Sequence, residues 1–489
     1  MDSLYGTSLS LLTDLYELTM AYGYWKAGRG EQEAVFNLFF RKPPFKGGYA
    51  LACGLEPALE FLQTLRFTDD DLAYLAELKG SDDQPLFEVA FLDYLRDMRF
   101  SCDVDAIPEG TVVFGNEPLV RIQGPILQAQ IIETALLTIL NFQTLIATKA
   151  ARVCQSAQGE PVLEFGLRRA QGIDGGISAS RAAYIGGCAA TSNVLAGKRY
   201  GIPVKGTHAH SWVMSFDSEA EAFAAYARAL PNNCIFLVDT YNTLEGVQHA
   251  IEAGKRLREA GHEMNGIRLD SGDLAYLSIE ARRMLDEAGF PKASIVASND
   301  LDEYLIRSLK DQDAAITVWG VGTNLVTAYD QPALGGVYKL AALRRNDGTW
   351  EPKIKLSEQT IKVNNPGRQQ VRRYRNDRGF AADMIYDLDA PPAADQAPVI
   401  IDPNDITRRK RLSPETPSEE LLVPVMRAGK LVYPLPSLSD VRQRAHQQLA
   451  SLHPTIKRFE NPHLYPVGLE EAYYQRKLDL ILKMKAINT

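Results

Sequence analysis

The sequence is poor in residue types that mark several classes of protein. Its 489 residues include five cysteines, scattered and without a Cys-x-x-Cys pair. This pattern argues against a disulfide framework or a cysteine-based zinc site and favours reduced thiols in the cytoplasm. No strong block of basic residues occurs, and the net charge is -8. That charge balance argues against nucleic acid as a partner.

Long uncharged apolar runs are also missing. The longest apolar stretch, residues 126–151, contains Gln128, Glu133 and Lys149, and a membrane span rarely tolerates such residues. We therefore expect a buried helix there and no membrane partner. Residues 1–5 contain no basic segment, so a secretory signal peptide is not expected.

The remaining composition is that of an ordinary globular protein. Hydrophobic residues make up 45% and charged residues 23%, which is typical of a protein with a large core. The length predicts two or three domains.

The N-terminal part of the sequence reads as a mixture of helix and strand. Apolar spacing predicts a helix over 15–26, and Asp14 and Glu17 have the spacing of an N-cap with a capping-box acid. Strands are predicted over 34–40 and 111–122, which are bounded by proline and glycine.

From about residue 162 the sequence alternates between short apolar runs and helix-like stretches. This alternation is the signature of a parallel α/β domain. The predicted strands are 162–165, 202–205, 235–238, 267–269, 294–297 and 316–320. The predicted helices are 178–199, 218–230, 243–260, 274–288 and 301–310.

Polar side chains follow every one of these six apolar runs. In α/β barrels the active site is built from several strand ends, whereas an open sheet concentrates its site at one switch point. Six contributing ends therefore favour a closed or nearly closed barrel. The residues that follow the runs include Arg168 and Arg169, His208 and His210, Asp239, Asp270, Ser298 and Thr323.

Three of these strand-end turns have residues suited to binding phosphate. Backbone N–H groups in short, small-residue turns bind anions where a helix begins. The alternative for each turn is ordinary N-capping of the next helix. The turns contain Ser271, Gly272 and Asp273, Ser298 and Asn299, and Gly322 and Thr323.

Arginines accompany these turns. Strand alternation places Arg268 and Asp270 on one face, where a charge pair is costly unless it is paired or contacts a ligand. Arg168 and Arg169 offer donors suited to a carboxylate or a phosphate. The alternatives are a buried structural ion pair for Arg268 and a surface salt bridge for the other two.

Two of the seven histidines, His208 and His210, follow the second apolar run. On a strand, both would project from the same face, which is a possible start of a metal site. A metal site would need further histidines at later strand ends, and none is present there. This leaves a structural histidine, or a nucleophile or general base.

Seven segments resemble motifs of the nicotinate phosphoribosyltransferase family, and they occur in the family's order. The resemblance runs from residue 11 to residue 340 and is weaker after residue 345. The segments are 11–21 (LLTDLYELTMA), 164–172 (EFGLRRAQG), 206–211 (GTHAHS), 238–243 (VDTYNT), 268–274 (RLDSGDL), 320–324 (GVGTN) and 334–340 (LGGVYKL).

The resemblance implies an enzyme that joins nicotinate to phosphoribosyl pyrophosphate, giving nicotinate mononucleotide and pyrophosphate in NAD salvage. It implies coupling to ATP hydrolysis through a phosphohistidine, which is ligase chemistry, and Mg²⁺ bound mainly through pyrophosphate and ATP. A cytoplasmic homodimer is also implied.

The implied fold is an irregular TIM-like α/β barrel of the type II phosphoribosyltransferases, with a second α+β domain formed by both chain ends. The corresponding expectation is an N-terminal part over 1–125, a barrel over 126–345, and a C-terminal segment over 346–489 that packs with the N-terminal part.

The resemblance and the phosphate-type turns together assign roles to individual residues. His210 matches the phosphorylated histidine, and Asp270 matches an acid that faces the reacting nucleotide. The role of His208 stays open. The expected nicotinate contacts are Tyr16, Arg168, Thr207 and Arg268. The expected phosphoribosyl and phosphate contacts are Ser271, Gly272, Ser298, Asn299, Gly322 and Thr323.

Two alternatives to this function stay open. Nicotinamide could replace nicotinate as the base, since the motifs do not show a pocket. A catalytically idle barrel that binds nucleotides for regulation is the second alternative.

The C-terminal region allows only coarse predictions. The basic stretch 368–378 is interpreted as a solvated strand face, with a phosphate access route as the alternative. Residues 389–395 are predicted to form a loop, and residues 437–485 to be mainly helical.

Overall fold

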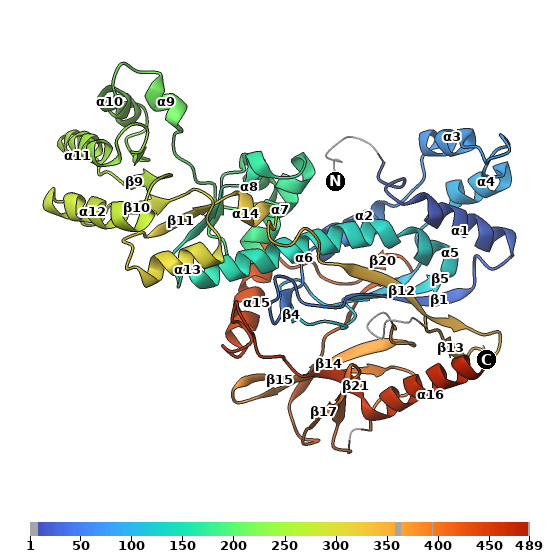
Figure 1. Cartoon of the computed structure of the whole chain (residues 1–489). Coiled ribbons are helices and arrows are strands. Elements are labelled where there is room, and N and C mark those ends of the chain that lie inside the picture. The colour runs from blue at the N-terminus through green and yellow to red at the C-terminus, as the bar shows by residue number, and fades with distance from the viewer. Residues whose placement is uncertain (1–7, 357–362, 394, 488–489) are drawn as a thin grey trace. The chain divides into compact units, whose positions relative to one another are not determined.

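The chain folds into two compact units (Figure 1). Unit 1 comprises Met1–Leu145 and Ala333–Thr489, so it contains both chain ends, and unit 2 comprises Ile146–Pro332. The computed structural model describes residues 8–356, 363–393 and 395–487.

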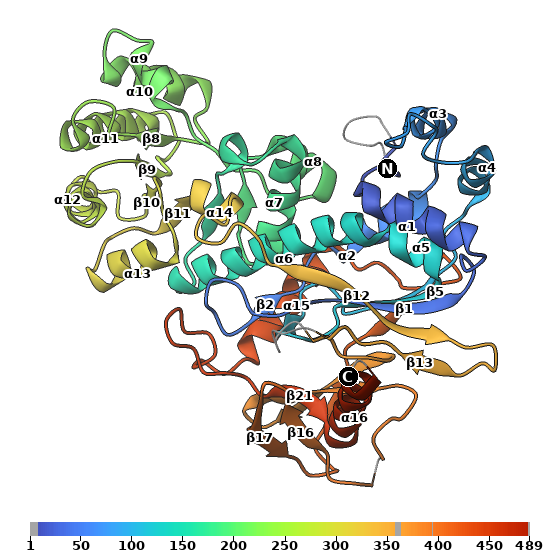
Figure 2. The ribbon, with the colours of Figure 1, turned by 45° about the vertical axis from the view of Figure 1, so that its right-hand side comes forward.

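The borders of unit 2 lie inside the predicted barrel domain 126–345. Residues 126–145 contain α5 (Ile126–Ile131), which packs beside α1 (Leu15–Lys26) in both views of the molecule (Figures 1 and 2). Residues 333–345 contain β12 (Gly336–Arg344), which pairs with β1 (Glu33–Phe40). Their partners therefore place both segments in unit 1.

Unit 1 contains two large sheets. The first has the order β13-β12-β1-β5-β3-β19-β20 among the described residues, so strands from both chain ends alternate in it. The second has the order β17-β16-β21-β15-β14-β18 and comes from the C-terminal part of the chain. The further strands of the first sheet are β3 (Asp103–Ala106), β5 (Val120–Pro125), β13 (Trp350–Pro352), β19 (Val423–Arg427) and β20 (Lys430–Leu431). The strands of the second are β14 (Gln369–Asn376), β15 (Gly379–Asp387), β16 (Val399–Asp402), β17 (Asp405–Arg411), β18 (Ser418–Glu420) and β21 (Val467–Glu470).

Helices and one small sheet complete unit 1. The small sheet pairs β2 (Ala50–Leu51) with β4 (Val112–Val113). The long helix α6 (Glu133–Ser156) begins in unit 1 and ends in unit 2. The other helices are α2 (Leu55–Thr64), α3 (Asp69–Glu77), α4 (Val89–Asp97), α15 (Leu438–Ala450) and α16 (Glu471–Ile487).

Unit 2 is built on a parallel sheet with the order β7-β6-β11-β10-β9-β8. Its first strand along the chain, β6, pairs in parallel with its last, β11, which is the neighbour relation of a barrel. Val204 forms a parallel bridge to Thr191 in β7. Among the described residues, no backbone ladder joins this bridge to β8, so closure of the ring stays a prediction. The strands are β6 (Val162–Glu164), β7 (Ala190–Thr191), β8 (Ile235–Leu237), β9 (Gly266–Leu269), β10 (Ser294–Ala297) and β11 (Val318–Val321).

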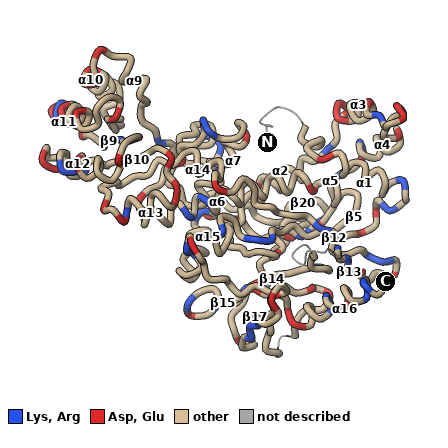
Figure 3. The backbone as a smooth tube through the Cα atoms, viewed as in Figure 1, with Lys and Arg blue, Asp and Glu red and all other residues tan. Residues whose placement is uncertain are grey.

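Helices follow the strands of unit 2, as the alternation predicts. Figure 3 shows charged residues of both signs on the outer helices α11 and α12, which include pairs such as Arg283 with Glu287. Such pairs are typical of solvated helix faces. The helices are η1 (Leu167–Arg169), α7 (Ile173–Ile185), α8 (Val194–Tyr200), α9 (His210–Met214), α10 (Glu219–Ala229), α11 (Thr243–Glu259), α12 (Leu274–Glu287), α13 (Glu303–Asp311) and α14 (Thr323–Val326).

Several local predictions are wrong. The single helix over 178–199 is two helices, because α7 ends at Ile185, Gly187 takes a positive φ of 122° and Asn193 caps α8. The strand over 111–122 is interrupted at Asn116, which also has a positive φ. Residues 202–205 contribute one bridge and no strand.

The predicted capping box at α1 is also wrong. Asp14 is the N-cap residue, but its side chain makes no capping hydrogen bond. The Glu17 carboxylate accepts hydrogen bonds from Thr13 and Thr134 instead. The predicted helix over 15–26 itself is confirmed.

The C-terminal predictions hold only in part. The helical interpretation of 437–485 fails between α15 and α16, where a loop leads into β21. The basic stretch 368–378 is a strand, but Arg373 is fully buried against Asp383, so its face is not uniformly solvated. In the described part of the chain, no helix is both long and apolar enough to cross a membrane.

Candidate active site

The strand ends of unit 2 bring Arg268, Asp270 and Ser298 into one cluster. The Arg268 guanidinium donates through Nη2 to Asp270 Oδ1 at 2.9 Å and through Nε to Ser298 Oγ at 2.7 Å. The Ser298 hydroxyl donates in turn to Asp270 Oδ1. Arg268 Nη1 also donates to Thr207 Oγ1 at 3.3 Å. The guanidinium is therefore held in one orientation, and the predicted pairing of Arg268 with Asp270 is confirmed.

Arg268, Asp270 and Ser298 line a small cavity of about 110 Å³ at the strand ends. Asn299, which also lines the cavity, has a φ of 116°. Residues other than glycine adopt this backbone conformation only at a cost in free energy. Phe165 lies in the cavity wall, 5.8 Å from the Arg268 guanidinium carbon to the ring centre. Of the predicted site residues, the cavity brings together Arg168, Arg268, Asp270, Ser298, Asn299, Gly322 and Thr323.

N-capping accounts for one residue of the predicted phosphate turn before α12, because Asp273 caps that helix, but not for the turn at Ser298 and Asn299 before α13. The side chain that caps α12 is Asp273, and the side chain that caps α13 is Asp302. Ser271 and Ser298 are thus not used as caps. Before α14, the N-cap is Gly322, which has no side chain to satisfy the first N–H groups of the helix. The first N–H groups of α14 can therefore donate to an anion, whereas N–H groups at the starts of α12 and α13 donate to the Asp273 and Asp302 side chains.

Ser271 and Gly272 lie outside the cavity lining. Ser271 Oγ donates to Asp239 Oδ2 at 2.7 Å, and the Asp270 N–H donates to the same oxygen at 2.8 Å. Gly272 has a φ of 80°, so this sharp turn requires glycine. This turn therefore helps to position Asp270.

Asp239 is a site residue to which the sequence analysis gave no role. It follows β8, and its Oδ2 fixes both the backbone and the side chain of the neighbouring turn. Its Oδ1 is buried and has no hydrogen-bond partner in the described part of the chain. The sequence signal for Asp239 was its position as a polar residue after an apolar run. The residue type alone could not show which turn Asp239 holds.

His210 is the first residue of α9, so the same-face arrangement that a strand would give His208 and His210 does not apply. Its Nδ1 lies 3.1 Å from Thr240 Oγ1, and its Nε2 lies 3.9 Å from Asp270 Oδ2. The side chain is 40% exposed. One ring nitrogen is therefore fixed by a hydroxyl, while the other faces a carboxylate and remains accessible.

His208 is buried and has a different environment. Its Nε2 accepts a hydrogen bond from the Leu237 N–H at 3.2 Å, and its ring contacts the rings of Tyr226 and Phe223. Burial lowers the pKa of His208 to about 4. This environment supports a structural role for a neutral His208, a role that the sequence left open.

Tyr16 belongs to unit 1 and lies on α1. Its side chain is 46% exposed, and burial of its hydroxyl, together with the nearby Glu133 and Glu17 carboxylates, raises its pKa. A larger cavity of about 730 Å³ also lies in unit 1, and no predicted site residue lines it. The strand-end cavity is therefore the candidate site, because it gathers the predicted chemistry.

The residues present fit a magnesium ion that is held mainly by phosphate oxygens. No group of three potential metal-binding side chains occurs within the residues that the structure describes. Mg²⁺ commonly takes one or two carboxylates and completes its shell with phosphate oxygens and water. Asp239 with its unpaired Oδ1, and Asp270, could supply those carboxylates.

The fold and site define an α/β protein with a candidate anion-binding site at the ends of parallel strands. Family models for nicotinate phosphoribosyltransferase match three parts of the sequence: the N-terminal domain over 11–141, the family model over 162–375 and the C-terminal domain over 368–477. The chain belongs to the nicotinate phosphoribosyltransferase family.

Individual relatives agree with this assignment. Nicotinate phosphoribosyltransferase of Bacillus subtilis (strain 168) is 45% identical over 495 aligned residues, which cover 98% of this chain and 96% of that protein. The crystal structure of human nicotinic acid phosphoribosyltransferase superposes with a TM-score of 0.84 at 33% identity, covering 96% and 99% of the two chains. Nicotinate-nucleotide pyrophosphorylase from Pyrococcus furiosus, at 21% identity and a TM-score of 0.69, shares the fold.

Proposed function

We propose that the protein transfers phosphoribosyl from phosphoribosyl pyrophosphate to nicotinate, forming nicotinate mononucleotide and pyrophosphate in NAD salvage. The observation that carries this proposal is the Arg268–Asp270–Ser298 cluster at the strand-end cavity of a member of this family. Loss of pyrophosphate leaves positive charge on the ribose, and the Asp270 carboxylate stabilises it.

Nicotinate recognition follows from the same cluster. The carboxylate of the base needs a cation, and Arg268 presents a guanidinium whose orientation is already fixed. Arg168 lines the same cavity, and the Thr207 hydroxyl oxygen accepts a hydrogen bond from Arg268. A homodimer would allow a partner chain to supply Tyr16 as the remaining expected nicotinate contact. The Ser298, Asn299, Gly322 and Thr323 turns bind the phosphate groups.

ATP coupling is proposed to run through His210. When Nδ1–H donates to Thr240 Oγ1, Nε2 carries the lone pair and is free to attack. Attack on the γ-phosphorus of ATP forms the N–P bond, breaks the bond to the bridging oxygen and releases ADP. Water later hydrolyses the phosphohistidine. Mg²⁺ would offset the charge of the phosphate groups, held by their oxygens and by Asp239 or Asp270.

The remaining expectations belong to the same proposal. Closure of the unit 2 strands into a TIM-like barrel is supported by the pairing of β6 with β11, and the His208 hydrogen bond to Leu237 spans the open position. A cytoplasmic setting fits the scattered cysteines.

A product assay tests the proposal. The purified protein is incubated with phosphoribosyl pyrophosphate and Mg²⁺, with nicotinate or nicotinamide as the base, with and without ATP. We expect nicotinate mononucleotide and pyrophosphate, formed faster with ATP. Preference for nicotinamide would correct the base, and binding without release of pyrophosphate would favour a regulatory, catalytically idle protein.

Labelling tests the phosphohistidine separately. Incubation with γ-labelled ATP should give a label on His210 that is labile to acid and stable to base. The His210→Ala variant should lose both the label and the stimulation by ATP. A variant that keeps full stimulation would refute this route.

A further inference from the structure

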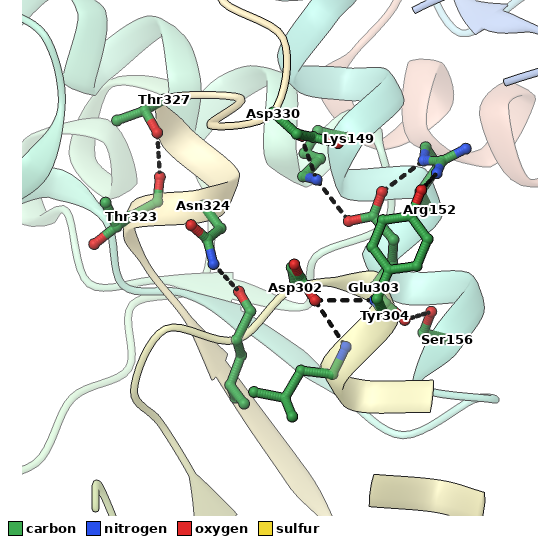
Figure 4. A network of polar contacts seen from close by, with 12 residues as sticks. Lys149, Arg152, Ser156, Asp302, Glu303, Tyr304, Thr323, Asn324, Thr327 and Asp330 are labelled. Carbon is green, nitrogen blue, oxygen red and sulfur yellow. Dashed lines mark hydrogen bonds and ion pairs between the residues drawn. The ribbon is translucent and has the colours of Figure 1, made fainter. Parts of the chain in front are cut away.

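Unit 2 contains a buried network of ion pairs outside the strand-end cavity (Figure 4). Lys149 Nζ lies 2.7 Å from Glu303 Oε2 and 2.8 Å from Asp330 Oδ1. Arg152 Nε donates to Glu303 Oε1 at 2.7 Å and Nη2 donates to the Tyr304 hydroxyl at 3.1 Å. The side chains of Lys149, Arg152 and Glu303 are at most 2% exposed.

This network holds the start of α13, directly after the phosphate-type turn at Ser298 and Asn299. Glu303 is the first residue of α13, and its carbonyl oxygen accepts a hydrogen bond from Ser156 Oγ at 2.6 Å. Both Ser156 and Lys149 lie on α6. Helix α6 therefore holds the chain that follows this turn. Lys149 contacts the side chain of Glu303, and Ser156 contacts its backbone carbonyl oxygen.

The same network reaches the second phosphate-type turn at Gly322 and Thr323. Asp330 lies four residues beyond the end of α14, which that turn begins. Lys149 bridges Asp330 to Glu303, as Figure 4 shows. One ammonium group thus ties the segment after α14 to the start of α13.

A direct link between the two turns completes the arrangement. Asn324 Nδ2 in α14 donates to the Asp300 carbonyl oxygen at 2.9 Å. Asn299, one residue earlier, has a φ of 116°, and a strained residue keeps such a conformation only when its surroundings enforce it. Asn324, through Asp300, and Glu303, at the start of α13, both hold the chain that follows Asn299.

Burying charged side chains to hold a helix costs desolvation free energy. Well-packed apolar residues often stabilise a core equally well, and in some proteins a buried ion network specifies a particular geometry. The present network specifies the distance between the start of α13 and the segment after α14. Both segments flank residues that line the candidate cavity.

We propose that Lys149 is a positioning residue that, through Glu303 and Asp330, fixes the spacing between the Ser298–Asn299 and Gly322–Thr323 turns and so sets the affinity for phosphoribosyl pyrophosphate. The inference rests on the proposed function. Lys149 contacts no reacting atom in this arrangement. It should therefore affect binding of the phosphorylated substrate more than the chemical step.

The test replaces Lys149 by methionine, whose unbranched side chain is one heavy atom shorter and carries no charge. A matched control is Lys310→Met, because Lys310 pairs with Glu160 at 2.6 Å near the other end of α13. For Lys149→Met we expect the KM for phosphoribosyl pyrophosphate to rise about tenfold, since small misplacements of binding groups have large effects. The KM for nicotinate and kcat should change much less, and Lys310→Met should match the wild type.

A double-mutant comparison tests the route of the effect. Asp330→Asn should raise the same KM, and adding it to Lys149→Met should raise it little further, because Asp330 acts through Lys149. Asp330 is 37% exposed, so this variant provides the test if Lys149→Met does not fold. Calorimetric titration with phosphoribosyl pyrophosphate gives the affinity without turnover.

The outcomes separate the inference from the proposed function. Wild-type protein that neither binds phosphoribosyl pyrophosphate nor forms product refutes the proposed function, and the inference with it. Active wild type with an unchanged KM and affinity in folded Lys149→Met overturns the inference alone. An equal rise in Lys310→Met also overturns it, because it would indicate general loosening of α13.

Discussion

His208 and His210 lie two residues apart, yet their ring nitrogens meet different surroundings. His208 accepts a backbone hydrogen bond within an aromatic cluster, whereas His210 faces Asp270 and is partly exposed. The family resemblance and the phosphate-type turns gave His210 an expected role and left that of His208 open. The difference coincides with a change of backbone structure, because α9 begins at His210 and His208 lies before it.

The buried state of His208 predicts a specific dependence of stability on pH. Its folded-state pKa of about 4 lies below the ordinary value of 6.5. Below pH 6.5 the unfolded chain takes up a proton that the folded chain does not. The free energy of unfolding should therefore fall as the pH drops from 6.5 towards 4, by about 3 kcal/mol in total.

Denaturant unfolding of the wild type and a His208→Gln variant measures this contribution. Glutamine can still accept from the Leu237 N–H but does not titrate. The difference in unfolding free energy between the two proteins should shrink or reverse between pH 7 and pH 4.5. A difference that stays constant across this range would contradict a neutral buried His208.

Asp270 carries the second prediction at this scale. Asp270→Asn keeps an oxygen for Arg268 and Ser298 but removes the negative charge that the proposed mechanism uses. We expect kcat to fall by roughly two orders of magnitude, with a smaller change in the KM for nicotinate. Steady-state assays measure both, and Asp302→Asn is the control, since asparagine caps a helix as well as aspartate. Equal losses in both variants would refute the role of Asp270.

At the scale of elements, the strand-end turns were more predictable than the breaks between elements. The strand 294–297 and the helix 15–26 follow from periodicity, and the structure confirms both. The break inside 178–199 did not, because Gly187 and the cap residue Asn193 lie in a sequence that is also compatible with a continuous helix.

Contacts between distant residues explain the rest of what the sequence could not show. Apolar spacing predicts that α6 is buried, but it does not predict that Lys149 meets Glu303, more than 150 positions along the chain. The role of Asp239 depends likewise on a distant residue, because its carboxylate accepts a hydrogen bond from the Asp270 N–H at another strand end. Such pairings are fixed by tertiary packing and leave no local pattern.

Two glycines of unit 2 should respond in opposite directions to alanine. Gly272 has a φ of 80°, and an added Cβ would lie 2.8 Å from Leu277 Cδ1, so Gly272→Ala should lower the unfolding free energy by about 1 kcal/mol or more. Gly175 lies within α7 with open space around it, so Gly175→Ala should raise it by about 0.5 to 1 kcal/mol. Chemical denaturation measures both changes, and a stable Gly272→Ala would contradict the proposed strain.

At the scale of the whole molecule, the chain uses buried charges in both units. In unit 2 the Lys149 network flanks the candidate site. In unit 1 Arg373 on β14 donates to Asp383 on β15, and both side chains are fully buried. The Tyr465 hydroxyl donates to the same carboxylate at 2.9 Å, so this cluster joins the strand pair to the chain just before β21.

Arg373 is therefore predicted to serve the stability of unit 1. Arg373→Met leaves Asp383 buried without its cation, and the unfolding free energy should fall by about 3 to 5 kcal/mol. Arg378→Met is the matched control, because Arg378 is exposed in the turn between the same two strands, and such a change should stay within about 0.5 kcal/mol.

Hydrogen exchange measured by mass spectrometry locates this effect. Arg373→Met should speed exchange in β14, β15 and β21, while exchange in the unit 2 strands β9 and β10 should change less, because the two units have separate cores. Lys149→Met should show the converse pattern, with faster exchange around the start of α13. Uniform acceleration through both units in either variant would mean that the chain unfolds as one cooperative body, and the two ion networks could then not be assigned separate roles.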